Sequence, residues 1–158
     1  MPTVYFMCGL PATGKSTYIK ENLRGFPIVS TDNYIEKYAA LVGRTYDQCF
    51  RDAIDNATVN EHSKVRYFVE DGISFVWDQT NLSPAKRKFL VSMIPKDWNK
   101  VVICLPTPDE DEWNRRLNNR PGKTIPKNVL ESMKNTFSFP TDLEGFDEII
   151  HVKEPTVA

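Results

Sequence analysis

The sequence has few of the residues that build disulfide scaffolds or zinc sites. Its 158 residues include three cysteines (Cys8, Cys49 and Cys104) and two histidines, without the spacing of a zinc site. No apolar run approaches the roughly 20 residues of a membrane-spanning helix, and the N-terminus lacks the pattern of a signal peptide. We therefore expect reduced, buried thiols, no membrane partner and a cytoplasmic location.

An excess of charge of either sign is also absent. Twenty Lys and Arg residues face 21 Asp and Glu residues, for a formal net charge of −1. This balance argues against a protein that coats nucleic acid by electrostatic attraction alone, but it leaves room for a local basic groove. The length suits a single domain spanning 1–158, and the 41% of hydrophobic residues is ordinary for a globular chain.

Short apolar runs alternate with longer segments of helical pattern. We expect buried strands at 4–8, 27–29, 73–77, 101–105 and 148–152. We expect helices at 15–23, 33–41 and 46–69, from 84 onward, and at 107–119 and 126–136. Because the strand runs are continuous rather than alternating, they indicate a parallel sheet covered on both faces. The prediction is an α/β fold of three layers with about four or five strands and a loose tail at 154–158.

Three of these helices carry recognisable start signals. Thr45 and Gln48 are spaced as a capping box requires, and Ser83 is followed by a proline in the first helical position. Thr107 and Glu110 repeat the three-residue spacing, so Thr107 is expected to begin the helix at 107–119.

A glycine-rich segment follows the first strand and precedes the first helix. Residues 9–16 read GLPATGKS and satisfy G-x-x-x-x-G-K-[ST], a loop whose amides bind phosphate at a helix N-terminus. Lys15 places a cation near the β- and γ-phosphates, and the hydroxyl of Ser16 can ligate Mg²⁺. The cofactors predicted are ATP and Mg²⁺. The residues expected to contact ATP here are Gly9, Pro11, Ala12, Thr13, Gly14, Lys15, Ser16 and Thr17.

Two aspartates follow the next strands, at the sheet edge where ligands bind in such folds. Asp32 is either a general base that takes the proton of an acceptor hydroxyl or the N-cap of the following helix. Asp78 either serves the acceptor or a magnesium-bound water, or it forms a turn before Thr80 and Asn81.

A basic segment without acids, about 114–127, is predicted to be a lid over the phosphates. Arg116 and Arg120 are four residues apart and share a helix face, from which they would neutralise charge on the transferred group. For Arg115 a solvated position is the simpler expectation. Lys86, Arg87 and Lys88 form a second basic cluster, either a solvated face or a nucleic-acid contact.

Four separated stretches resemble the 5′-hydroxyl polynucleotide kinases of bacteriophages, within the zeta-toxin-like P-loop kinases. They read GLPATGKST at 9–17, STDNY at 30–34, DQTNLSPAKRK at 78–88, and RRLNNRPGKTIP at 115–126 leading into NVLESM at 128–133. The resemblance spans roughly 3–136. It implies a P-loop kinase that phosphorylates the 5′-hydroxyl of DNA or RNA, in the host cytoplasm if the chain is phage-encoded.

The same resemblance implies roles for individual residues. Lys15, Asp32 and Arg120 would be catalytic, with Asp32 as the general base, and Arg116 and Arg120 would reach the donor phosphates. The predicted acceptor-binding residues are Asp32, Asp78, Thr80, Asn81 and Arg87.

Two positions depart from the family pattern. Ile35 stands where the family has an arginine that grips the acceptor phosphate, and Lys37, Arg44 or Arg51 are the candidates to replace it. Trp77 is bulky for its position and either stacks on a base or fills the core of the sheet. No D-x-D-G-[TS] phosphatase motif occurs, so kinase activity alone is expected.

Competing functions remain open at this stage. The chain has no N-K-x-D element for guanine and is shorter than an AAA+ motor with its helical second domain. A kinase for a small molecule, such as a nucleoside, nucleotide or antibiotic, is the first alternative, and a non-catalytic ATP-binding adaptor is the second.

Overall fold

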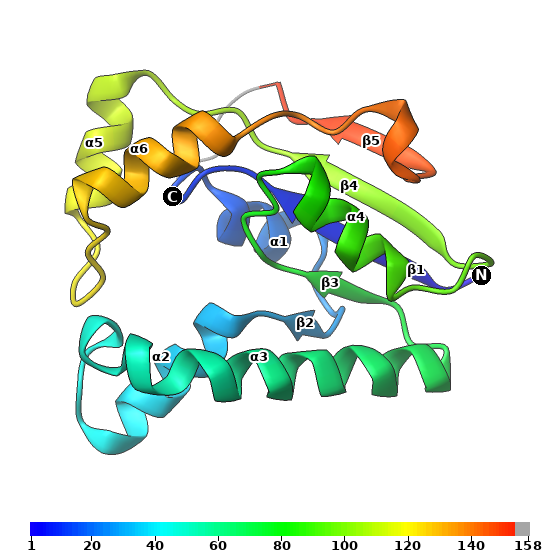
Figure 1. Ribbon diagram of the computed structural model, residues 1–158, viewed down its shortest axis with the longest axis horizontal. Helices are drawn as coiled ribbons and strands as arrows, with labels where there is room; N and C mark the ends of the chain where they lie inside the picture. Colours follow the sequence, from blue (N-terminus) through cyan, green and yellow to red (C-terminus); the bar gives the residue numbers. More distant parts are fainter. Residues whose placement is uncertain (154–158) are drawn as a thin grey trace.

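The computed structural model describes residues 1–153, and the predicted tail at 154–158 lies outside this range (Figure 1). Five parallel strands form one sheet in the order β2-β3-β1-β4-β5. The strands are β1 (Thr3–Cys8), β2 (Ile28–Val29), β3 (Phe75–Trp77), β4 (Asn99–Cys104) and β5 (Glu148–His151). The predicted parallel sheet is confirmed.

Helices connect every pair of successive strands. They are α1 (Lys15–Asn22), α2 (Thr31–Val42), α3 (Tyr46–Asp71), α4 (Pro84–Ser92), α5 (Glu110–Asn118) and α6 (Lys127–Thr136). A short 3₁₀ turn, η1 (Asp142–Glu144), was not predicted. Among residues 1–153, no helix combines the length and the apolar composition needed to cross a bilayer.

The helices cover the sheet on both faces, which confirms the three layers. On one face Phe6 and Phe75 of the sheet pack with Val65 of α3 and Leu90 of α4. On the other face Met7, Val76 and Ile103 pack with Ile19 and Leu23, the latter directly after α1. Successive strand residues point to opposite faces, so the continuous apolar runs supply both cores.

Buried residues settle two expectations from the sequence. Trp77 is buried and stacks on Phe6 with ring centroids 5.7 Å apart, so it fills the core rather than facing a base. Cys8, Cys49 and Cys104 are all buried free thiols.

The caps decide where several helices begin. Thr45 and Gln48 form the predicted capping box at α3, and Ser83 caps α4. The predicted start at Thr107 is wrong, because Asp109 caps α5 by accepting from the Glu112 amide at 3.0 Å. A carboxylate satisfies the first amides of a helix and also interacts favourably with the helix dipole.

Helix α2 begins two residues earlier than predicted. Ser30 is its N-cap and accepts from the Asn33 amide at 3.2 Å. Asp32 therefore lies within the first turn and does not cap the helix. Its carboxylate is available to the space beyond the carboxyl ends of the strands.

Candidate active site

The phosphate loop joins β1 to α1 and is strained at one residue, Ala12, which has positive φ without being a glycine. Gly14 and Ala12 both have positive φ, 99° and 60°, and the Thr13 hydroxyl donates to the Leu10 carbonyl at 2.8 Å. Helix α1 has no side-chain cap, so its first amides are suited to bind an anion. Gly9 and Thr13 form the inner side of this loop, whereas the other predicted loop residues line a cavity.

Lys15 bends back over its own loop. Its ammonium donates to the carbonyls of Gly9 at 2.9 Å and Leu10 at 2.7 Å. Burial lowers the pKa of Lys15 to about 8, while the negative charge of Asp78 acts in the opposite direction. The cation is thus held at the position where phosphate charge would be neutralised.

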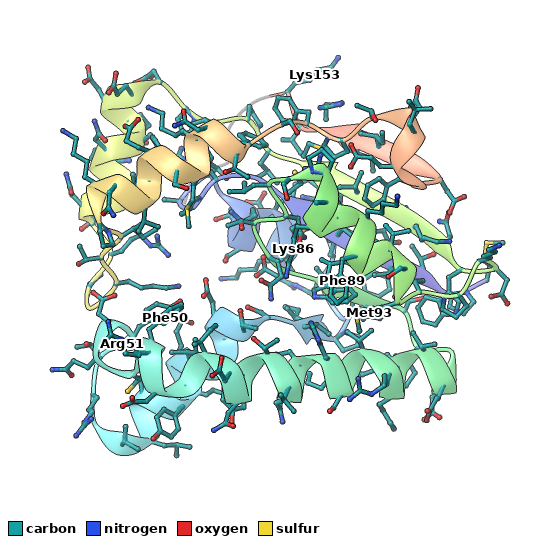
Figure 2. All side chains as sticks on the ribbon, viewed as in Figure 1. Phe50, Arg51, Lys86, Phe89, Met93 and Lys153 are labelled. Atoms are coloured by element: carbon teal, nitrogen blue, oxygen red, sulfur yellow. The ribbon has the colours of Figure 1, made fainter. Side chains whose placement is uncertain are left out.

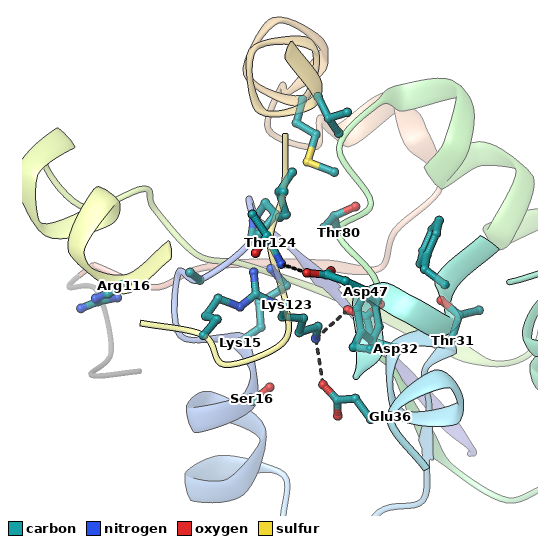
Figure 3. Close-up of a pocket in the computed structure, with 18 of the residues that line it drawn as sticks. Lys15, Ser16, Thr31, Asp32, Glu36, Asp47, Thr80, Arg116, Lys123 and Thr124 are labelled. Atoms are coloured by element: carbon teal, nitrogen blue, oxygen red, sulfur yellow. Dashed lines mark hydrogen bonds and ion pairs between the residues drawn. The ribbon is translucent and has the colours of Figure 1, made fainter. Parts of the chain in front are cut away.

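Asp32 is held by two partners that the sequence did not predict; Figure 3 shows one of them, Lys123, between Asp32 and Glu36. The Tyr46 hydroxyl donates to one carboxylate oxygen, Oδ1, at 2.6 Å. Lys123 approaches the other, Oδ2, at 3.5 Å and pairs more closely with Glu36 at 2.8 Å. Burial and the hydrogen bond to Asp32 raise the pKa of Tyr46, so the phenol stays a donor. One carboxylate oxygen is firmly bonded and the other only loosely.

The predicted lid is docked on the start of α3. The Gly122 carbonyl accepts from the Asp47 amide at 2.9 Å, and the Thr124 amide donates to the Asp47 carboxylate at 2.7 Å. Lys123, between them, also lies over the Tyr46 ring at 4.6 Å. These contacts bring the lid next to Asp32.

The lid arginines keep unused donors. Arg116 donates through Nε to Glu112 at 2.9 Å, yet its Nη1 atom and that of Arg120 are buried without a hydrogen-bond partner in the described part of the chain. Buried guanidinium nitrogens without acceptors are costly, so an anionic ligand fits here. Arg115 pairs with Glu112 and its side chain is 62% exposed, although it also borders the cavity.

Asp78 and Thr80 follow β3 and face the same space. Burial raises the pKa of Asp78 to about 6, against the opposing effect of Lys15. The Gln79 side chain donates through Nε2 to the Thr31 hydroxyl at 3.3 Å, which ties this loop to the start of α2. The two aspartates and Lys15 therefore form one electrostatic cluster.

Two of the predicted acceptor-binding residues do not reach the cavity. Arg87 is 1% exposed and pairs with Glu144 at 2.6 Å; it also donates to the Asn81 carbonyl at 2.9 Å. The Asn81 side chain donates to the Met7 carbonyl at 2.6 Å. Both side chains hold the loop after β3 from the side away from the cavity, so we do not propose that either residue binds the acceptor.

One cavity of about 1130 Å³ unites these groups. Binding sites for single small molecules occupy roughly 300–1,000 Å³, so the space admits two substrates. Its phosphate-loop and strand-end walls include Pro11, Ala12, Gly14, Lys15, Ser16, Thr17, Asp32, Asp78 and Thr80. Its lid and α3 walls include Tyr46, Phe50, Arg51, Ile54, Arg116, Arg120 and Lys123.

The donor set fits a magnesium-bound triphosphate. Within residues 1–153, no three His, Cys, Asp or Glu side chains are grouped to hold a metal by themselves. Mg²⁺ is commonly bound through substrate phosphates and few protein ligands, and the exposed Ser16 hydroxyl beside the loop suits that arrangement. The unpaired guanidinium donors of the lid suit the phosphate oxygens.

Comparison with known proteins finds a distant relative among ribonucleoproteins. The mouse heterogeneous nuclear ribonucleoprotein U-like protein 2 is 27% identical over 161 residues, covering 94% of this chain and 21% of that protein. The chain thus spans about a fifth of the length of the relatives that it matches.

Solved structures share the fold. A Chloroflexus aurantiacus protein to which a kinase function has been attributed has a TM-score of 0.69, with 19% identity over 96% of this chain and 84% of its own. A chain of the Pnkp1/Rnl/Hen1 RNA repair complex has 0.66, with 19% identity over 86% and 44%. A Sinorhizobium meliloti gluconokinase has 0.56, with 16% identity over 98% and 85%. At these identities the likeness shows a P-loop kinase-type fold.

A family model described as an AAA domain matches residues 4–140, which include the phosphate loop, both aspartates and the lid. The expectation that the chain is not an AAA+ motor with a helical second domain stays a prediction. The chain belongs to this AAA domain family, and its fold is that of the P-loop kinases.

Proposed function

We propose that this protein transfers the γ-phosphoryl group of ATP to the 5′-hydroxyl end of DNA or RNA. The observation that carries the proposal is one cavity with a firmly held carboxylate, Asp32, on one wall and the phosphate loop with Lys15 on another. Phosphoryl transfer mainly needs positioning and charge neutralisation, and this cavity supplies both.

The donor side would hold the triphosphate. The amides at the start of α1 and the ammonium of Lys15 would bind its phosphates, and Arg116 and Arg120 would turn their unpaired Nη1 atoms to the same oxygens. Mg²⁺, held by Ser16 and the phosphates, would neutralise charge that develops during transfer. The lid arginines would thereby stabilise the charge that develops on the transferred group.

The acceptor side would activate the alcohol. The loosely bonded Oδ2 of Asp32 would accept the hydroxyl proton while the alcohol oxygen bonds to the γ-phosphorus. The bond from that phosphorus to the β–γ bridging oxygen breaks, and ADP leaves with the electron pair. Tyr46 and Lys123 would fix the orientation of the carboxylate throughout.

The nucleic-acid acceptor is supported by the four motifs and their order in the chain. The fold shared with a chain of an RNA repair complex, and the ribonucleoprotein relative, agree with it. Asp78 and Thr80, which belong to the D-x-T-N-L-x-P motif, line the same cavity as Asp32.

A kinase for a small alcohol is the second candidate. Glu36 and Asp47 lie beside Asp32, so this end of the cavity is not uniformly basic. Weakly charged acceptors, as in the gluconokinase that shares the fold, would tolerate these carboxylates better than a polyanion.

An acceptor panel separates the two candidates. ATP labelled at the γ-phosphate would be incubated with 5′-hydroxyl DNA and RNA oligonucleotides, nucleosides and sugars, with a 5′-phosphorylated oligonucleotide as the control. We expect label on the 5′-hydroxyl ends and none on the control. Transfer to small alcohols alone rejects the polynucleotide reading, and ATP binding without any acceptor-dependent turnover rejects both in favour of an adaptor.

A further inference from the structure

One face of α3 forms a wall of the cavity beyond Asp32. Tyr46, Phe50 and Ile54 recur at four-residue spacing, as neighbours on a helix surface do, and all three line the cavity. The Tyr46 and Phe50 rings lie 5.8 Å apart, and the Tyr46 hydroxyl holds Asp32. From Tyr46 to Ile54 this face extends roughly 12 Å, at 1.5 Å per helical residue.

Two features of this wall stand out (Figure 2). Phe50, near the lid end of α3, is 42% exposed although large and apolar. Arg51 is exposed, lines the cavity, and forms no ion pair or hydrogen bond with the part of the chain that is described. An aromatic ring and an unpaired guanidinium therefore lie side by side in sequence, on the same wall.

The other cations of the cavity are engaged or belong to the donor side. Lys15 is bonded to loop carbonyls, Arg115 and Arg116 to Glu112, and Lys123 to Glu36 and Asp32. Arg120 lies on the lid, with its buried nitrogen suited to the triphosphate. Arg51 is the remaining cation among the lining residues, and it has neither an ion pair within the described part of the chain nor a position beside the phosphate loop.

The other positions considered for an acceptor contact do not reach this space. Ile35 is 0% exposed and packs against Ala39, Cys49 and Ala53 between α2 and α3. Lys37 and Arg44 are not among the lining residues. Arg51 and Phe50 therefore place a cation without a partner among residues 1–153 and a partly exposed aromatic ring on the α3 wall of the cavity that Asp32 also lines.

We infer that this wall binds the first nucleotide of the acceptor, an inference that rests on the proposed function. Arg51 pairs with the phosphate on the 3′ side of that nucleotide, and Phe50, flanked by Ile54, packs against its base. Guanidinium groups favour phosphate oxygens, and aromatic side chains stack on bases without sequence preference. The 5′-hydroxyl is thereby directed at Asp32, which is bonded to Tyr46, one helical turn from Phe50.

The test compares acceptors that differ only in this phosphate. Transfer to a nucleoside 3′-monophosphate and to the free nucleoside would be measured for wild type, Arg51→Gln and the control Arg44→Gln. We expect Arg51→Gln to raise the acceptor KM roughly 10- to 100-fold for the 3′-phosphate, from the loss of a charge-assisted contact. The KM for the free nucleoside and for ATP should change little, and Arg44→Gln should match wild type.

A binding measurement without ATP keeps the inference independent of turnover. Fluorescence anisotropy of a labelled 5′-hydroxyl trinucleotide should show at least a tenfold weaker Kd for Arg51→Gln, and Phe50→Leu should weaken binding of all four bases alike. Equal affinity of wild type and Arg51→Gln overturns the inference, as does an equal KM increase for nucleoside and 3′-phosphate. If Arg51-dependent binding occurs but wild type transfers no phosphate, the inference stands and the proposed function fails.

Discussion

Asp78 and Lys15 are opposite charges that burial pushes toward their neutral forms. Burial raises the pKa of Asp78 to about 6 and lowers that of Lys15 to about 8. Each charge partly restores the ionisation of the other. Ionisable groups with perturbed pKa values are common in functional clefts. Keeping them charged and buried lowers the stability of the fold.

Replacing Asp78 by Asn should therefore stabilise the fold at neutral pH. The folded protein favours the neutral form of Asp78, because the folded pKa of about 6 lies above the ordinary value of 3.8. The stability that Asp78 contributes is therefore fully present below pH 3.8 and is lost as the pH rises through about 6. At pH 7.5 we expect Asp78→Asn to be more stable than wild type by roughly 1–2 kcal/mol, because a buried charge is removed. The gain is limited to this range because Lys15 loses its ionic partner in the variant. Urea denaturation at pH 7.5 and pH 4.5 measures this, and an unchanged or reversed difference at pH 7.5 contradicts it.

Tyr46 is a positioning residue for Asp32, and Tyr46→Phe tests that role. Loss of the 2.6 Å hydrogen bond leaves the carboxylate free to rotate, so we expect kcat to fall roughly tenfold, as for a single misplaced catalytic contact. The KM for ATP should be unchanged. Tyr38→Phe, on the exposed face of α2, is the control, and combining Tyr46→Phe with Asp32→Asn should add little. Full additivity of the two changes would exclude the positioning role.

At the scale of elements, local sequence decides much of the structure. The capping box at Thr45 and the Ser83-Pro84 pair place the starts of α3 and α4, because a cap needs only residues three apart. Where two residues could each cap the same helix, the three-residue spacing does not decide which of them is the cap. Thr107 satisfied the spacing rule, but Asp109 caps α5, and η1 is not apparent from any periodic pattern because it is only three residues long.

The docked lid depends on a glycine. Gly122 has a φ of +69°, and a Cβ there would lie 2.9 Å from the Thr45 Cβ. Gly122→Ala should undock the lid, lower kcat and expose the Thr124 amide. Gly43→Ala is the matched control, since Gly43 has the same φ of +69° with nothing within 4 Å. It should cost roughly 1–2 kcal/mol of stability from backbone strain alone and leave activity intact.

Hydrogen exchange and steady-state kinetics on both glycine variants distinguish these outcomes. If the Thr124 amide exchanges faster in Gly122→Ala but not in Gly43→Ala, the result supports a docked lid. Equal exchange and equal activity in the two variants would show that the contact with Thr45 has no role in catalysis.

At the scale of the whole molecule, the sequence predicts the layers better than the contacts of the site. Continuous apolar runs require a sheet buried on both faces, and the phosphate loop identifies the edge where ligands bind. The partners of Asp32 could not be predicted, because Tyr46 is 14 residues away and Lys123 is 91 residues away. Their approach depends on how α2 packs on α3 and how the lid docks, which no local pattern encodes. The inward turn of Arg87 toward Glu144 is a further case, 57 residues apart.

ATP should stabilise the whole fold through the phosphate loop. At a ligand concentration about 100 times Kd, binding adds about 2.7 kcal/mol, which raises the Tm of a domain of this size by roughly 5–10 °C. Differential scanning fluorimetry with Mg²⁺ and ATP measures the shift. Lys15→Met should abolish most of it, and an undiminished shift in that variant would place the nucleotide elsewhere.

The central claim is that the Asp32 carboxylate takes the acceptor proton opposite a triphosphate held by the loop. Single-turnover transfer from γ-labelled ATP to a 5′-hydroxyl oligonucleotide, with wild type and Asp32→Asn at saturating ATP, tests it most directly. We predict a transfer rate roughly 10²- to 10⁴-fold lower in Asp32→Asn, the range for loss of a general base, with the Kd for ATP unchanged. Transfer by Asp32→Asn at close to the wild-type rate would contradict the assignment.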